Sequence, residues 1–322
     1  MDIKQIESKY VIHMNDSADW LRHYDEGTQV VNDFILPVGP HQKDEMSDTI
    51  YHKDATVPYH QHRRGVETFY IAAGSVECFI RGRRFIALTG DMIHLPPHTP
   101  HGFHFLEEGT IWRELFQEID MSQGILEKNT VMQNYPELLK DDEFLVVYRG
   151  GRNELRREPP VCETVDRTEM HELRTPEFAF SEYHGDGFDL KLKVGKWETG
   201  GVKEVWHASL KQGLKVSFDY PHPHYELYYV TGGRIKLTVL GEEFIAEKDT
   251  LIRIPPFRKH SFEVLEDATL FDYGGETDLM ALLEDYKSVM TNDPARLNDP
   301  TAHTAFLRKY GCFATGIEYS RG

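Results

Sequence analysis

This chain of 322 residues has little cysteine, little positive charge and no long apolar run. Its cysteines, Cys78, Cys162 and Cys312, are odd in number and far apart, which argues against a disulfide framework and favours reduced thiols. Lysine and arginine total 36 against 53 acidic residues, and the net charge of -17 disfavours nucleic acid or an anionic membrane as a partner. No apolar run approaches the roughly 20 residues that span a bilayer, which disfavours an integral membrane protein.

The composition is that of a soluble globular protein. Hydrophobic residues make up 40% of the chain and aromatic residues 12%, which is enough for well-packed cores in two domains of ordinary size. The first residues are charged and lack the apolar stretch of a secretory signal. We therefore expect a cytoplasmic protein.

Three histidines and one glutamate between residues 60 and 101 form the strongest chemical signal. His60 and His62 lie on the same face of a strand, because side chains alternate with period two. Glu67 across the following turn and His101 from a distant strand can complete a compact ligand set. Such a set suits one divalent transition metal, Fe, Mn, Ni, Co or Zn, and suits calcium poorly. Glu67 could also move a proton as a catalytic group.

The spacing of these residues resembles the two motifs of the cupin superfamily. The first motif has the form H-x-H, three or four residues, E, six residues, G, and the second has a Gly-Asp, a proline pair and a closing histidine. The matching residues are His60, His62, Glu67, Gly74, Gly90, Asp91, Pro96 and His101. The resemblance covers roughly residues 45 to 115 and implies a β-barrel with a metal held by the three histidines and Glu67.

The same pattern returns with a shift of 159 residues. Glu67 then aligns with Glu226 and His101 with His260, without a gap between them. A spacing that holds from the glutamate to the last histidine indicates duplication of a whole barrel. The chain therefore resembles a bicupin. The predicted fold is all-β, with two tandem cupin barrels (double-stranded β-helix, or jelly-roll) and a few peripheral helices.

The second copy departs from the motif ahead of Glu226, where residues 219–225 read DYPHPHY. In one register His222 is the second ligand and Tyr220 takes the place of the first histidine. In another register the two histidines of the run are the pair, and in a third Asp219 and Pro221 hold the ligand positions. We prefer the first register. It predicts a possible second metal site of Tyr220, His222, Glu226 and His260, or else a scaffold whose residual polar groups hydrogen-bond one another.

Composition and turn residues divide the chain into five parts. We predict an N-terminal extension at 1–40, an N-terminal barrel at 41–150, a linker at 151–188, a C-terminal barrel at 189–276 and a helical tail at 277–322. A cap at Asp16 and a stop near Gly27 predict a short helix through Trp20, Leu21 and Tyr24. Apolar spacing predicts an amphipathic helix from Leu279.

Strand alternation predicts the lining of the first barrel. Phe69 should share the inner face with Glu67, and Phe103 and Phe105 should share it with His101. An apolar lining around a metal favours a flat, ring-containing ligand over a highly hydroxylated sugar.

Among cupins with two barrels, the first motif and the overall length resemble the quercetin dioxygenase group. That resemblance implies a dioxygenase that opens the ring of a small, oxygen-rich cyclic substrate such as a polyphenol or an enolisable diketone. The same ligands serve non-redox chemistry elsewhere in the superfamily, so a hydrolase of a carbon–carbon bond in a cyclic 1,3-diketone, or an isomerase, stays open. A non-catalytic small-molecule binding protein is the third hypothesis. A small-molecule substrate and a homodimer are expected.

Overall fold

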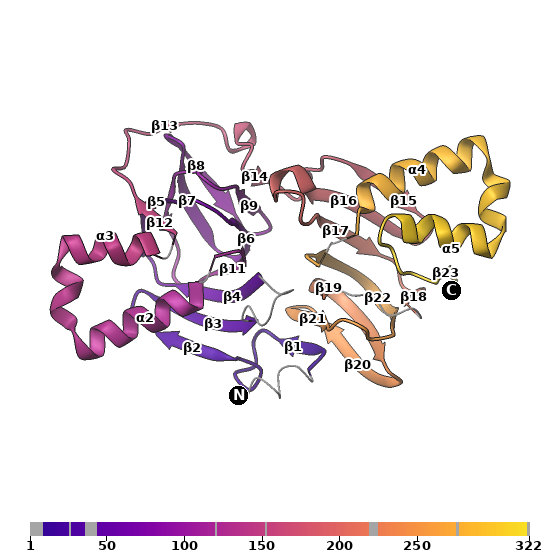
Figure 1. Cartoon of the computed structure of the whole chain (residues 1–322), viewed down its shortest axis with the longest axis horizontal. Helices are drawn as coiled ribbons and strands as arrows, with labels where there is room; N and C mark the ends of the chain where they lie inside the picture. The colour runs from indigo at the N-terminus through magenta and orange to yellow at the C-terminus, as the bar shows by residue number, and fades with distance from the viewer. Residues whose placement is uncertain are drawn as a thin grey trace. The chain divides into compact units, whose positions relative to one another are not determined.

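The computed structural model describes residues 9–25, 27–35, 44–119, 121–151, 153–218, 225–274 and 277–320. The chain forms two compact units, Trp20–Glu177 and Phe178–Gly322, and the described residues before Trp20 belong to the second. No helix in these ranges is long and apolar enough to cross a membrane. Most of the described elements are strands, as the all-β prediction requires, so the fold class is confirmed (Figure 1).

The first unit contains two sheets. One has the strand order β14-β9-β6-β11-β4-β3-β2, and the other has the order β12-β5-β10-β7-β8-β13. Their bounds are β2 (Arg22–Asp25), β3 (Gln29–Ile35), β4 (Asp44–Tyr51), β5 (Thr56–His62), β6 (Val66–Ala73), β7 (Ser75–Ile80), β8 (Arg83–Leu88), β9 (Met92–Leu95), β10 (His101–Phe105), β11 (Thr110–Gln117), β12 (Glu154–Arg156), β13 (Glu163–Thr164) and β14 (Leu173–Arg174). The pairings are antiparallel except β13 with β8. This is the jelly-roll arrangement of two packed sheets.

Alternation along the strands builds one core from both sheets. Phe69 on β6 and Trp112 on β11 come from one sheet, and Phe103 on β10 comes from the other; all three are buried together. Phe105 is also buried, and its ring stacks on Tyr51 at 3.5 Å between centroids. The inward direction predicted for the aromatic side chains of β6 and β10 is confirmed.

Helical segments follow the last long strand of the first unit. They are α2 (Met121–Asn134), the 3-10 turn Pro136–Lys140 and α3 (Asp142–Gly151), and the chain then returns as β12 to pair with β5. A further 3-10 turn, Arg167–Glu169, precedes β14.

The second unit is built around two long strands, β19 and β22 (Figure 1). Its main sheet has the order β1-β21-β19-β22-β17-β16-β15, with β18 paired to β22 and β23, and β20 paired to β19. The bounds are β1 (Val11–His13), β15 (Glu182–Gly185), β16 (Phe188–Val194), β17 (Val205–Leu210), β18 (Leu214–Phe218), β19 (Glu226–Val239), β20 (Glu242–Glu247), β21 (Thr250–Ile254), β22 (His260–Asp272) and β23 (Gly316–Tyr319). The helical elements of this unit are the 3-10 turns Lys196–Glu198 and Pro294–Asn298, with α4 (Leu279–Asn292) and α5 (Pro300–Lys309). The amphipathic helix predicted from Leu279 is confirmed.

The motif glycine of each copy sits where only glycine fits. Gly74 has φ +87°, and a Cβ there would lie 2.4 Å from Thr110 Oγ1. Gly233 has φ +75°, and a Cβ there would lie 2.1 Å from the Asp267 carbonyl oxygen. Both the backbone conformation and the close approach exclude a side chain.

The structure differs from the predicted layout in two segments. Residues 151–188, predicted as a linker, supply β12, β13 and β14 to the first unit and β15 to the second. The predicted helix around Trp20 is wrong, since Arg22–Asp25 is a strand paired with β3, and Val11–His13 joins the other unit through β21. Pairing with distant strands outweighs local helical spacing here.

Candidate metal centre

Four side chains from three strands converge inside the first barrel. His60 and His62 end β5, Glu67 begins β6 and His101 begins β10, where it lies directly opposite His60. Each of the four is buried, and one potential ligand atom from each lies within 4.8 Å of all the others. The structure thus brings together the whole predicted ligand set.

Glu67 lies between two of the histidines. Its Oε1 is 3.3 Å from His62 Nε2, and its Oε2 is 3.3 Å from His101 Nε2. The rings of His60 and His101 are 4.3 Å apart between centroids. Three imidazole nitrogens and a carboxylate oxygen at this spacing fit a divalent transition metal.

Backbone carbonyls orient two of the imidazoles. His60 Nδ1 donates to the Pro58 carbonyl at 2.8 Å, and His101 Nδ1 donates to the Thr99 carbonyl at 2.8 Å. Because a carbonyl can only accept, the proton of each neutral ring lies on Nδ1, and the lone pair of Nε2 faces the centre. Metal-ligating histidines ordinarily use such a hydrogen bond to fix their tautomer.

The protonation states also suit a metal. Burial lowers the pKa of His60 well below its ordinary value, and the charge of His101 adds to this effect. Burial likewise lowers the pKa of His101. Burial alone would raise the pKa of Glu67, but the adjacent His62 and His101 outweigh it and hold the pKa at about 2. Neutral imidazole and ionised carboxylate are the forms that bind a metal, so few protons need to leave.

A cavity of about 460 Å³ opens onto this cluster. Its lining includes His60, Glu67 and His101, together with aromatic side chains from both sheets, Tyr51, Phe69, Phe103, Trp112 and Phe116. Of the predicted pocket residues, Phe69 and Phe103 line the cavity, and Phe105 is packed behind it in the core. The volume is in the range of ordinary small-molecule sites.

Glu114 on β11 is a site residue that the motifs do not reveal. It lies opposite Phe69 of β6, lines the same cavity and is buried. Ser47 Oγ donates to its Oε2 at 3.1 Å. Burial raises the pKa of Glu114 well above its ordinary value, and the negative charge of Glu67 adds to the rise. Beside the ionised acid of the metal cluster, the cavity therefore holds a neutral acid. The alternation Trp112-Glu114-Phe116, an acid between two inward aromatics, is the sequence signal that could have found it.

Basic side chains also line this cavity. Lys128 comes from α2, Arg149 from α3 and Arg156 from β12, where the Nε of Arg156 lies 2.5 Å from Glu154 Oε1. Their positive charge can attract an anionic group into the cavity, although the chain as a whole is strongly acidic.

The second barrel repeats only part of the cluster in the described residues. His260 Nε2 lies 2.9 Å from Glu226 Oε2, and its Nδ1 donates to the Arg258 carbonyl at 3.1 Å, as His101 does to Thr99. The described residues of this cluster are thus one histidine and one glutamate in contact with each other. Tyr220 and His222, the other predicted members of this site, lie outside the described residues.

The two barrels place an acid at the same point of the sheet, buried in the first and half-buried in the second. Glu114 lies opposite Phe69, two residues after Glu67, and Asp272 lies opposite Tyr228, two residues after Glu226. Glu114 and Asp272 are 158 residues apart, whereas the two copies of the motif align with a shift of 159. The gapless alignment of the two copies therefore does not pair these acids.

Two regions of the chain match the cupin domain family, at residues 48–111 and 206–271. They contain the two motif glutamates and the two closing histidines. A search by sequence found no match among curated proteins.

Solved structures of Bacillus subtilis oxalate decarboxylase have a similar fold. One, from a study of its Mn(II) centres, is 14% identical with a TM-score of 0.53 and covers 98% of this chain and 89% of that one. A point mutant of the enzyme OxdC is 14% identical with a TM-score of 0.51, covering 89% and 84%. The enzyme at pH 4.6 is 14% identical with a TM-score of 0.50, covering 89% and 83%. At this identity the likeness shows the fold.

Proposed function

Since this chain is a bicupin, a member of the cupin superfamily with two barrels, we propose that its first barrel is a divalent-metal-dependent enzyme that opens the ring of a small, oxygen-rich cyclic substrate. The observation that carries the proposal is the shared cavity, in which Glu114 faces the same space as His60, Glu67 and His101. Aromatic walls around a metal cluster favour a flat ring over an extended acid or a sugar.

Hydrolysis of a carbon–carbon bond in a cyclic 1,3-diketone suits this cavity best. A divalent metal held by the three histidines and Glu67 would supply Lewis-acid stabilisation of the negative charge that develops on a substrate oxygen. In the overall reaction the oxygen of water bonds to a ring carbonyl carbon, the bond from that carbon to the ring carbon between the two carbonyls breaks, and this second carbon takes a proton. The product is an open-chain keto acid.

Glu114 is suited to deliver that proton. A neutral carboxylic acid beside the substrate can donate to the carbon released by bond cleavage, and the carboxylic acid group that forms from the attacking water can then return a proton to it. Ser47, which donates to Oε2, orients the carboxyl group while it is neutral and while it is charged. The basic side chains Lys128, Arg149 and Arg156 supply positive charge for the carboxylate of the product.

Ring opening with dioxygen is the second candidate, because the ligand set is the one used by the quercetin dioxygenase group. It requires no neutral acid in the cavity, so Glu114 favours the hydrolytic reaction. Decarboxylation of oxalate, the activity named for the similar solved structures, would leave most of the aromatic wall without a contact.

Turnover in water enriched in oxygen-18 distinguishes these reactions. The protein is loaded with Mn(II) or Fe(II) and given cyclohexane-1,3-dione, a flavonol or oxalate, in air and under argon. We expect the diketone to give an open-chain keto acid at equal rates in both atmospheres, with one oxygen from water. Oxygen uptake that tracks product would replace hydrolysis by the dioxygenase reaction. Turnover of oxalate alone would contradict ring opening altogether.

A further inference from the structure

The second barrel contains its own cavity, separate in sequence from the metal cluster. Its volume is about 220 Å³, and residues from Phe188 to Ile317 of the second unit line it. An apolar cavity of about 150 Å³ is already large enough to bind benzene in another protein. The space is therefore sufficient for a ring-containing molecule.

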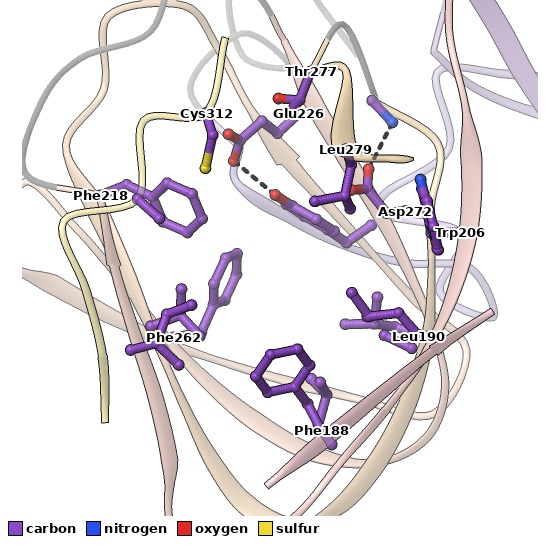
Figure 2. Close-up of a pocket in the computed structure, with 18 of the residues that line it drawn as sticks. Phe188, Leu190, Trp206, Phe218, Glu226, Phe262, Asp272, Thr277, Leu279 and Cys312 are labelled. Atoms are coloured by element: carbon purple, nitrogen blue, oxygen red, sulfur yellow. Dashed lines mark hydrogen bonds between the residues drawn. The ribbon is translucent and has the colours of Figure 1, made fainter. Parts of the chain in front are cut away.

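The cavity is apolar along most of its length and acidic at one end. Figure 2 shows Glu226 and Asp272 near one end and Phe188 near the other, with Phe218 and Phe262 along the wall between them. This division of polarity fits a ligand with an apolar body and one polar end.

The acidic end is built from ordered hydrogen bonds. Tyr228 Oη donates to Glu226 Oε2 at 3.0 Å, and the backbone N–H of Gly274 donates to Asp272 Oδ1 at 3.0 Å. Asp272 is half-buried, and the loss of solvent around its carboxyl group, followed by the charge of Glu226, raises its pKa to about 7. Carboxyl oxygens at this end accept hydrogen bonds, which favours a ligand whose polar group can donate one.

Charge narrows the class of ligand further. No lysine or arginine occurs among the described residues that line the cavity, so an anionic head group would meet two acids and no cation. Glu226 Oε2 already contacts the His260 ring at 2.9 Å and the Tyr228 hydroxyl at 3.0 Å, so this carboxyl group has partners without a cationic ligand. A neutral hydroxyl is the donor that remains.

The end of the chain covers the acidic end of this cavity. Gly311, Cys312, Phe313 and Ala314 line it after α5, and β23 then pairs with β18. Figure 2 shows Cys312 and Thr277 beside Glu226.

We propose that the second barrel binds a small neutral aromatic alcohol, with its ring among Phe188, Phe218 and Phe262 and its hydroxyl donating to the carboxyl group of Asp272, beside Glu226. The proposal is independent of the reaction proposed for the first barrel. Neither metal nor turnover is needed for it.

Fluorine NMR titration of the full chain with para-fluorophenol tests this site. The His101→Ala variant is titrated in parallel, since it disrupts the first site and should leave the second intact. We expect one saturable site per chain in both proteins. We also expect binding at least tenfold tighter than that of fluorobenzene, para-fluorobenzoate or para-fluorobenzylamine. Absence of saturable binding, its loss in His101→Ala, or equal or tighter binding of the benzoate or the amine would overturn the proposal.

Two kinds of variant locate the ligand. Val216→Trp fills the cavity from β18 and should weaken para-fluorophenol binding at least tenfold, whereas Ile245→Trp, a matched change on the exposed side of β20, should not. Asp272→Leu should weaken the phenol about tenfold and leave fluorobenzene unchanged. This ratio cannot arise from misfolding alone, so it decides the question even if Val216→Trp is unstable. Equal affinity of the phenol for Asp272→Leu and the native chain would refute the acidic contact.

Discussion

Replacing Glu114 by glutamine should make the protein less active and more stable at once. The pKa of Glu114 is raised well above its ordinary value, first by burial and then by the charge of Glu67. The folded protein therefore keeps a proton that the unfolded chain releases above about pH 4.5. Between the pKa of Glu114 in the unfolded chain and its pKa in the folded protein, each pH unit lowers the unfolding free energy of the native protein by about 1.4 kcal/mol.

Glutamine is neutral at every pH and has the same shape, so Glu114→Gln removes this cost. The variant should gain stability relative to the native chain as pH rises above about 4.5, by up to about 1.4 kcal/mol per pH unit, measured by urea unfolding at pH 5 and pH 6. The amide can still accept from Ser47 Oγ, which limits any loss from the hydrogen bond.

The same variant should lose a proton donor. We expect kcat for ring opening to fall about 10²- to 10⁴-fold, the usual contribution of general acid catalysis, with a smaller change in KM. Asp272→Asn is the matched control, because Asp272 holds the equivalent place in the second barrel. It should change stability in the same direction and leave kcat intact. Unchanged kcat in Glu114→Gln, or an equal loss in Asp272→Asn, would refute the role assigned to Glu114.

Further predictions concern the metal, the motif glycine and the second acid. His60→Ala removes a ligand and should weaken Mn(II) binding, measured by calorimetry. The loss should exceed the 10- to 100-fold that is typical when a residue hydrogen-bonded to a metal ligand is replaced. An affinity equal to that of the native chain would contradict the assigned site. Gly74→Ala should lower the unfolding free energy by about 1–3 kcal/mol more than Gly109→Ala does. Gly109 also has a positive φ, but a Cβ there would meet no atom within 4 Å. Equal losses of stability in thermal melts of the two variants would exclude the contact with Thr110. Asp272 has a pKa of about 7 in the folded protein against 3.8 in the unfolded chain, so it contributes stability at low pH that is lost as pH rises towards 7. Asp272→Asn should remove this contribution to the pH dependence of the unfolding free energy, measured by urea titrations. An unchanged pH dependence would exclude Asp272 as its source.

The metal cluster was predictable from sequence because strand geometry is local. Period-two alternation places His60 and His62 on one face, and the turn after β5 brings Glu67 back beside them. Repetition of the motif predicted both barrels. Long strands and amphipathic helices such as α4 follow from patterns of the same kind.

What the sequence did not reveal depends on distant pairing. Val11–His13 joins the second unit through β21, and the short strands β12 and β14 add to the first barrel from a segment that looks like a linker. Strands of two or three residues carry too little alternation to be distinguished from loops. Glu114 was missed because an acid in a strand ordinarily faces solvent, and only the closed barrel places it inside.

Anomalous diffraction from crystals grown with Mn(II) tests whether the first barrel holds a metal. We expect a manganese peak in the first barrel, within coordination distance of His60 Nε2, His62 Nε2, Glu67 and His101 Nε2. A native crystal in which these four side chains diverge, with no anomalous peak between them at saturating Mn(II), would contradict it.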